Sequence, residues 1–229
     1  MRKIGFLLLM MLLFVCTPCI ANENISLYSA SQQEDKIETA TGLKKLEGER
    51  FILDLKYNSE DNFLKKNVYK DFGIESVYVH KEVYDKIKSL ETILKEKKLK
   101  LVIFDAYRPL EVQKAMWEIL PDSRYVANPK TGSLHNRGVA IDVCLANEDG
   151  TYLEFPTEFD SFEAKAAHTY ECTPEEQHKA ENRALLKNLM ESVGLMPIRT
   201  EWWHYQLPDA KKYPLLSISK EKGEIKNEK

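Results

Sequence analysis

Two separate clusters in the sequence carry the side chains that a metal-dependent hydrolase needs. In the first cluster, His135 and Asp142 lie seven positions apart, and Gly138 between them would allow the backbone to turn. Catalytic zinc sites favour imidazole nitrogen together with carboxylate oxygen as ligands. Histidines in loops are often structural, so this cluster alone leaves a metal site and a structural role both open.

The second cluster is Glu201-Trp202-Trp203-His204. His204 would complete a set of three protein ligands, which leaves one coordination position for water, and Glu201 would take a proton from that water. Alternatively, Glu201 is a surface charge and His204 packs beside the two tryptophans. Side chains three positions apart point to opposite sides of a regular strand. We therefore predict a bulge or a strand end that brings Glu201 and His204 to one site.

A third cluster spans residues 105–109, where a short apolar run gives way to a proline that suits the first turn of a helix. Arg108 in this cluster would stabilise the negative charge that develops on a peptide carbonyl oxygen during attack by water. For a lone arginine, an ion pair with Asp105 is the favoured alternative.

Hydrophobic patterns predict the elements that position these clusters. Alternation of apolar and polar residues, or a short apolar run, predicts extended segments over residues 51–57, 100–104, 139–145 and 198–207. Apolar stripes predict helices with buried positions at Val83, Ile87, Leu90 and Leu94 (residues 80–97), at Val112, Met116 and Ile119 (after Pro109), and at Leu185, Leu189 and Val193 (Thr173 to Gly194). Since helices and strands are interspersed irregularly, we expect an α+β fold, a single domain with a mainly antiparallel sheet flanked by helices.

The start of the chain differs from the rest. Arg2 and Lys3 precede an apolar run of about twelve residues, and small residues lie at the usual cleavage positions before Ala21. This pattern predicts a signal peptide, an exported protein in the periplasm or outside the cell, and no stable membrane insertion after cleavage; an uncleaved anchor is the alternative. The chain divides into a signal peptide (1–21), an N-terminal surface segment (22–48), a catalytic domain (49–216) and a flexible charged tail (217–229).

Charge and cysteine content limit the partners and the kind of metal site. The formal net charge is −3 and no basic stripe is present, so we expect no nucleic-acid partner. Cys144 and Cys172 remain after cleavage, and they could form a disulfide or stay as free thiols. Cys144 follows Asp142 by two positions on the same strand face, and a fourth ligand there would make the metal structural and the protein a non-enzyme.

Together the three clusters resemble the D-alanyl-D-alanine dipeptidases of the vancomycin-resistance type, a zinc peptidase family that also contains D,D-carboxypeptidases. The family patterns Asp-x-Tyr-Arg-Pro, Ser-x-His-x-x-Gly-x-Ala-x-Asp and Glu-Trp-Trp-His match residues 105–109, 133–142 and 201–204. The resemblance implies the zinc D,D-peptidase (hedgehog-like) fold. It also implies one zinc ion per chain, held by three ligands: His135, Asp142 and His204.

The resemblance implies further roles. Glu201 would be the general base and acid, and Arg108 would hold the carbonyl oxygen as charge develops. Three more residues would line or support the substrate pocket: Tyr57, Asp105 and Ser133. His168 matches a family histidine, and His178 is expected to be exposed.

The implied reaction is hydrolysis of a small D-amino-acid dipeptide, D-Ala-D-Ala, to two D-alanines. The alternatives are a D,D- or L,D-carboxypeptidase that trims peptidoglycan stem peptides and a non-catalytic protein that binds cell-wall peptides. The resistance enzymes act on a cytoplasmic pool that an exported enzyme cannot reach. Recycling or scavenging of wall dipeptides is therefore favoured over antibiotic resistance.

Overall fold

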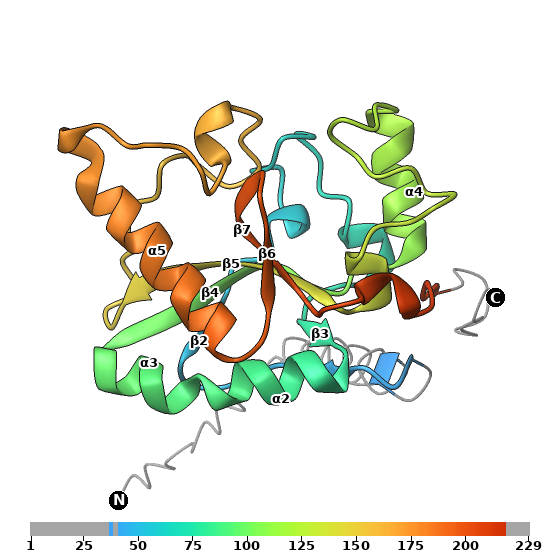
Figure 1. Ribbon diagram of the computed structural model, residues 1–229. Helices are drawn as coiled ribbons and strands as arrows, with labels where there is room; N and C mark the ends of the chain where they lie inside the picture. Colours follow the sequence, from blue (N-terminus) through green and yellow to red (C-terminus); the bar gives the residue numbers. More distant parts are fainter. Residues whose placement is uncertain (1–36, 39–40, 219–229) are drawn as a thin grey trace, which may run out of the picture.

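The computed structural model describes residues 37–38 and 41–218 (Figure 1). The predicted signal peptide, and most of the predicted tail, lie outside these residues. Ser217 and Ile218, which were assigned to the tail, are buried, and the backbone N–H of Ile218 donates to Glu111 Oε2 at 2.8 Å. The packed part of the chain therefore extends at least to Ile218.

A five-stranded sheet forms the centre of the fold, in the order β2-β4-β5-β7-β6. Its strands are β2 (Phe51–Leu53), β4 (Leu99–Asp105), β5 (Ala140–Asn147), β6 (Met196–Ile198) and β7 (Glu201–Gln206). β2 runs parallel to β4, whereas the β4-β5, β5-β7 and β6-β7 pairs are antiparallel. The prediction of an α+β fold with a mainly antiparallel sheet is confirmed. Strands β1 (Lys44–Lys45) and β3 (Tyr78–Val79) form a small second sheet.

Among residues 42–218, four α-helices lie around this sheet. They are α2 (Lys81–Ser89), α3 (Glu91–Lys97), α4 (Leu110–Ile119) and α5 (Gln177–Ser192). Single turns of 3₁₀ helix are η1 (Lys56–Asn58), η2 (Lys70–Phe72), η3 (His135–Arg137), η4 (Ala164–Ala166), η5 (Pro174–Glu176) and η6 (Ala210–Lys212). In Figure 1, α2 and α3 run below the sheet, while α4 and several long loops lie above it.

Helices α3 and α5 and the polar residues of interest use opposite faces of the sheet. Side chains alternate along a strand, so Ile141 and Tyr205 point away from Asp142 and His204. Tyr205 faces charged residues of α5, and α3 and α5 both contact the sheet. The face with Ile141 and Tyr205 is therefore the helix-covered one, and the opposite face is left for chemistry.

Three predictions about elements need correction. The strand predicted over 51–57 ends at Leu53, because the chain turns into η1 and buries the ring of Tyr57. The helix predicted over 80–97 is two helices that meet at Leu90, where the Ser89 hydroxyl donates to the carbonyl of Lys86 at 2.6 Å.

The third correction concerns α5. Its buried apolar residues are Leu186, Leu189 and Met190, while Leu185 and Val193 are only half-buried. Leu185, Leu189 and Val193 are each four residues apart, and such positions move gradually around a helix with 3.6 residues per turn. Positions whose spacing alternates between three and four residues stay on one face of the helix. The capping box of Thr173 and Glu176 is present, and Gly194 follows the helix with φ of 77°.

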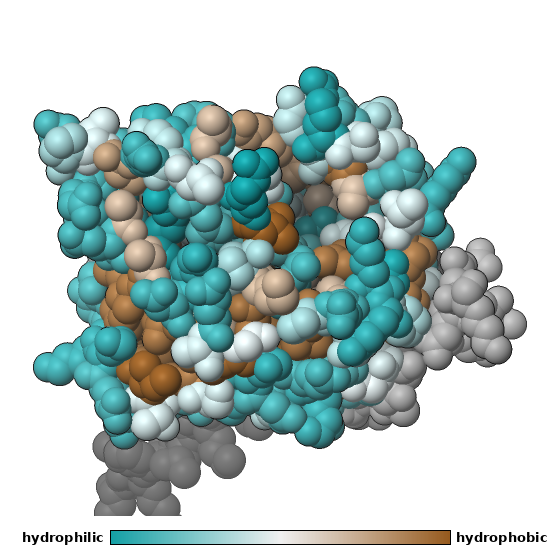
Figure 2. All heavy atoms as spheres, viewed as in Figure 1, coloured by the Kyte–Doolittle hydropathy of each residue, from teal (hydrophilic) through white to brown (hydrophobic). Residues whose placement is uncertain are grey.

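The surface is largely polar. Figure 2 shows hydrophilic residues over most of one face, with apolar patches among them. Among residues 37–38 and 41–218, no helix has the length and apolar character needed to cross a bilayer.

Candidate active site

Three neighbouring strands place Asp105, Asp142 and His204 in one row across the sheet. Asp105 of β4 is the register partner of Asp142 of β5, and Asp142 is the register partner of His204 of β7. A register shift between Ile103 and Asp105 adjusts the end of β4 next to this row. Two residues 62 positions apart in the sequence, Asp142 and His204, therefore lie side by side on the floor of the site.

His135 reaches the same place from the η3 turn that precedes β5. Gly138 ends that turn with φ of 66°, a left-handed conformation that favours glycine. Its carbonyl accepts a hydrogen bond from the backbone N–H of His80 at 2.7 Å, and a Cβ at position 138 would lie 2.5 Å from Leu43 Cδ2. Both the conformation and the close packing explain a glycine between His135 and Asp142, as the sequence predicted.

The side chains of His135, Asp142 and His204 converge on one point. Each offers a donor atom, and these atoms all lie within 4.8 Å of one another. His135 Nε2 is 3.2 Å from His204 Nδ1 and 3.4 Å from Asp142 Oδ2, and His204 Nδ1 is 3.0 Å from Asp142 Oδ1. The exposed fractions of the three residues are 4%, 3% and 7%. The predicted ligand set is therefore assembled and shielded from solvent.

The hydrogen bonds of the two histidine rings fit a metal ion. His135 Nδ1 lies 2.9 Å from the carbonyl oxygen of Ala106, and His204 Nε2 lies 3.1 Å from Gln206 Oε1. With a metal ion bound, each of these two nitrogens would carry the ring proton and donate it to the oxygen beside it. The lone pairs of His135 Nε2 and His204 Nδ1 then face one another beside a carboxylate. This arrangement is stabilised by a cation and resembles the way proteins orient metal-binding histidines.

Cys144 does not join this cluster. Within the described residues, the group able to hold a metal contains His135, Asp142 and His204 without a sulfur ligand. Cys144 instead lines a separate cavity of about 390 Å³, together with Phe104 and Trp202. Burial raises the pKa of its thiol, and both Cys144 and Cys172 are free. Three ligands without a fourth from the protein leave a coordination position open, which is typical of catalytic sites.

Glu201 lies beside the cluster because β7 is irregular. Ile198 of β6 pairs with Glu201, whereas the preceding Pro197 pairs with Tyr205, so the strands β6 and β7 shift register there. The predicted irregularity is confirmed, and Glu201 Oε2 comes within 4.0 Å of His204 Nδ1. Burial raises the pKa of Glu201, and the negative charge of Asp142 adds to this effect while the nearby histidines and Arg108 oppose it.

Arg108 and Asp105 form a buried ion pair behind His135. Arg108 Nε donates to Asp105 Oδ2 at 3.0 Å and Nη1 donates to Gln113 Oε1 at 3.0 Å, while Nη2 also contacts Asp105. The guanidinium lies over the ring of Tyr57 at 4.9 Å. Asp105 has no exposed surface, so its position supports Arg108 and does not face a substrate directly.

Tyr57 and Ser133 lie at the edges of the same site. The hydroxyl of Tyr57 donates to Asp160 Oδ2 at 2.8 Å. Ser133 Oγ accepts a bond from the backbone N–H of His135 at 3.3 Å. The sequence patterns predict no role for Asp160, which the structure places next to Tyr57.

Asp160 has two unusual properties. Its φ is 59°, which few residues other than glycine adopt. Burial raises its pKa well above the usual range, and the negative charges of Asp142 and Glu201 contribute. A half-buried carboxyl group beside other carboxylates gives up its proton more readily when a cation from outside the protein lies next to it.

His168 and His178, the two further histidines considered from the sequence, stay outside the cluster. His178 is exposed, as predicted, and its Nε2 lies 2.9 Å from Glu154 Oε2. His168 is half-buried, and burial together with Lys187 and Arg183 lowers its pKa to about 4.

A sheet that presents a His-Asp-His cluster with an open position, next to a carboxylate and a buried arginine, defines a metal-dependent hydrolase. The sequence profile of a family described as "D-ala-D-ala dipeptidase" matches residues 46–219, and the chain belongs to this family. The family is metal-dependent, so the protein is a metallopeptidase.

Two dipeptidases with similar sequences agree with this assignment. A D-alanyl-D-alanine dipeptidase of Escherichia coli (strain K12) is 35% identical over 165 residues, which cover 72% of this chain and 83% of that protein. A D-alanyl-D-alanine dipeptidase of Enterococcus faecalis (strain ATCC 700802 / V583) is 28% identical, covering 68% of this chain and 85% of that protein. The solved structure of an LD-carboxypeptidase, LdcB, is 18% identical over 59% of this chain and 63% of that chain, with a TM-score of 0.38.

Proposed function

We propose that the protein hydrolyses D-alanyl-D-alanine to two molecules of D-alanine, using one zinc ion held by His135, Asp142 and His204. The observation that carries this proposal is the convergence of these three side chains, with Glu201 within 4.0 Å of His204, in a member of the D-Ala-D-Ala dipeptidase family. The similar proteins from E. coli and E. faecalis bear the same activity in their names.

Two imidazole nitrogens and one carboxylate are a donor set that suits zinc. Zinc in this site would lower the pKa of a water molecule and polarise the peptide carbonyl. In this proposal, Glu201 accepts the proton of the attacking water and then passes it to the nitrogen of the leaving D-alanine. Its raised pKa suits both steps, although a bound dication opposes that shift.

Arg108 stabilises the charge that develops on the carbonyl oxygen. Three of its donor positions bind Asp105 and Gln113, and an arginine has five N–H groups. The other N–H groups are thus available to the carbonyl oxygen, and the ion pair with Asp105 holds the guanidinium in a fixed orientation.

Asp160 and Tyr57 would bind the free amino group of the dipeptide. The ammonium group supplies the positive charge that favours the ionised form of the half-buried Asp160, and the Tyr57 hydroxyl donates to Asp160 Oδ2 at 2.8 Å. Ser133, in the turn next to His135, is proposed to contact the other end of the substrate. A dipeptide with both ends charged fits this distribution of groups.

The test of the catalytic assignment is Glu201→Gln, with Glu154→Gln as a matched control on an exposed residue. We expect Glu201→Gln to keep one zinc ion per chain by metal analysis and to lose about 10²- to 10⁴-fold in kcat. The control should keep both. Loss of metal in Glu201→Gln would make Glu201 a ligand and would refute its role as the base.

The test of the substrate compares D-Ala-D-Ala with a muropeptide pentapeptide ending in D-Ala-D-Ala. Hydrolysis of the dipeptide is the expected result. Turnover of the pentapeptide alone would replace the dipeptidase proposal with the carboxypeptidase alternative.

We also propose that the protein is exported and recycles or scavenges dipeptides released from the cell wall. The support is the predicted signal peptide over residues 1–21. N-terminal sequencing of protein from the periplasmic fraction or the medium should begin at Asn22, whereas an intact Met1 in the cytoplasmic fraction would contradict export.

A further inference from the structure

Three loops above the sheet each combine a residue of the candidate site with an aromatic side chain farther along. The first loop carries Tyr57 and Phe63, the second carries Ser133 and Tyr125, and the third carries Asp160 and Phe162. In Figure 1 the three loops lie along the same upper side of the molecule. We call Phe63, Tyr125 and Phe162 the aromatic clasp.

The rings of the aromatic clasp touch one another. The Phe63 and Phe162 centroids are 5.3 Å apart with perpendicular rings, and the Tyr125 and Phe162 centroids are 4.3 Å apart. Phe63 also contacts Tyr57 edge-to-face at 6.2 Å. A continuous series of rings therefore runs from the active site to the outer surface and joins three loops that are distant in sequence.

Two of the three clasp residues are exposed although they are apolar, and Phe63 is half-buried. Phe162 is 55% exposed and Tyr125 is 38% exposed. Each contact between two aromatic rings is individually weak, so two contacts keep the loops together and still allow them to open when substrate enters. A role in the folded core does not explain side chains with this exposure.

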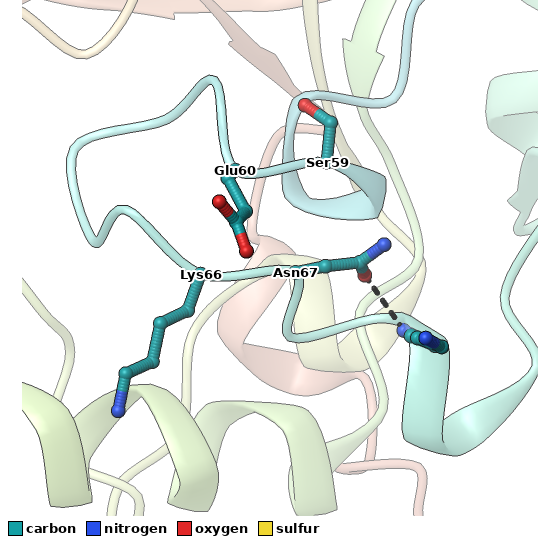
Figure 3. Close-up of a pocket in the computed structure, with 5 residues that line it drawn as sticks. Ser59, Glu60, Lys66 and Asn67 are labelled. Atoms are coloured by element: carbon teal, nitrogen blue, oxygen red, sulfur yellow. Dashed lines mark hydrogen bonds between the residues drawn. The ribbon is translucent and has the colours of Figure 1, made fainter.

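Side-chain hydrogen bonds stabilise two of the three loops. The Asn62 side chain donates to the carbonyls of Lys56, Ser59 and Lys66 at 3.2, 2.7 and 2.9 Å. Farther along the same loop, Asn67 Oδ1 accepts from the backbone N–H of Lys70 at 2.8 Å, beside a polar surface hollow of about 460 Å³ (Figure 3). Phe63 is therefore presented from a braced loop.

The second loop is connected to the catalytic arginine. Gln113 Nε2 donates to the carbonyl of Ala127 at 2.8 Å, and Gln113 Oε1 accepts from Arg108. Tyr125, two positions before Ala127, is thus fixed relative to Arg108. Phe162 lies between these two supported rings and completes the connection.

We propose that the aromatic clasp closes the amino-terminal end of the substrate site and thereby restricts the enzyme to peptides of two residues. This inference rests on the proposed function. Asp160 marks the end that receives the free amine, and Phe162 follows it by two positions. A substrate extended at its amino end must pass Asp160 and Tyr57, where the rings of Phe63 and Phe162 already lie.

The test compares two substrates, D-Ala-D-Ala and L-Lys-D-Ala-D-Ala, which both carry a free amine and differ in length. Phe162→Ala and Tyr125→Ala should raise the ratio of kcat/KM for the tripeptide over the dipeptide by about tenfold or more. Met196→Ala is the control, because Met196 is a similarly exposed apolar residue, on the edge strand β6. It should leave the ratio unchanged.

A binding measurement separates access from chemistry. In zinc-loaded Glu201→Gln protein, calorimetry should show that adding Phe162→Ala tightens tripeptide binding by about tenfold or more and leaves dipeptide binding within about twofold. An unchanged ratio in both clasp variants, or a wild-type protein that cleaves the tripeptide as well as the dipeptide, would overturn the role of the clasp. Failure of the zinc-loaded wild type to cleave D-Ala-D-Ala would instead refute the proposed function.

Discussion

Replacing Asp105 with asparagine removes one charge from a buried ion pair and leaves the shape of the side chain almost unchanged. Asp105 Oδ1 accepts from the Tyr69 hydroxyl and from the backbone N–H of Ala106, and Oδ2 accepts from Arg108. The exposed side-chain fractions of Asp105 and Arg108 are 0% and 9%. The substitution therefore leaves the guanidinium in the interior without its counter-charge.

The expected cost follows from that burial. Removing one partner of a buried pair destabilises a protein by about 3–5 kcal/mol, because the other charge stays desolvated. Arg108 keeps its bond to Gln113 and its contact with the Tyr57 ring, which places the loss near the lower end, about 3 kcal/mol. Since natural domains unfold at about 5–15 kcal/mol, the change is a large share of the total.

Urea unfolding followed by circular dichroism measures this loss, with and without zinc. Asp122→Asn is the matched control, because Asp122 pairs with an arginine, Arg124, whose side chain is 75% exposed. Exposed pairs contribute about 0–1 kcal/mol. Equal, small losses of unfolding free energy in both variants would refute the argument that Asp105 compensates a buried charge. Zinc affinity should also fall about 10- to 100-fold in Asp105→Asn, because Asp105 lies 3.5 Å from His135 Nδ1.

Three further outcomes are expected. Gly138→Ala forces a left-handed alanine against Leu43, so thermal unfolding should show a loss of about 1–3 kcal/mol; an unchanged melting temperature would contradict the close packing. Iodoacetamide at pH 8 should label Cys172 before Cys144 by mass spectrometry, since burial raises the pKa of the Cys144 thiol; equal labelling would argue against that burial. Burial lowers the pKa of His168 to about 4, below the value of about 6.5 in the unfolded chain, so protonation favours unfolding. Above about pH 6.5, His168 is neutral in the folded and the unfolded chain and does not change the free energy of unfolding. As the pH falls to about 4, protonation in the unfolded chain lowers the free energy of unfolding by up to about 3 kcal/mol. His168→Gln should flatten that part of the pH profile of the unfolding free energy.

Much of the candidate site could be predicted from the sequence, because its residues lie in short segments with strong local constraints. His135 lies in the single 3₁₀ turn before the strand that carries Asp142. Gly138 follows this turn in a left-handed conformation, where the backbone changes direction. The irregularity at Glu201 and His204 followed from the period of a strand alone, since a regular strand cannot bring both side chains to one point.

Other features depend on contacts that no local pattern contains. The role now proposed for Asp160 came from its burial and its bond with Tyr57, 103 positions earlier. The parallel pairing of β2 with β4 is set by a long connection through α2 and α3. The predictions of where β2 ends and of which face of α5 is buried were wrong for a related reason. Tertiary packing decides which of several apolar positions is buried.

The row of partners across β4, β5 and β7 has a consequence for how the protein holds together. β5 and β7 share only three register pairs, from Ala140 to Asp142, and an ion bound by His135 and His204 would tie together points 69 residues apart in the chain. Because such a crosslink forms only after the sheet has formed, it stabilises the folded chain by binding to it and is absent from the unfolded chain, unlike a disulfide. Amide hydrogen exchange along β7 should therefore slow sharply when the ion is added. In the metal-free protein, the pairing of β5 with β7 should be the first part of the sheet to unfold.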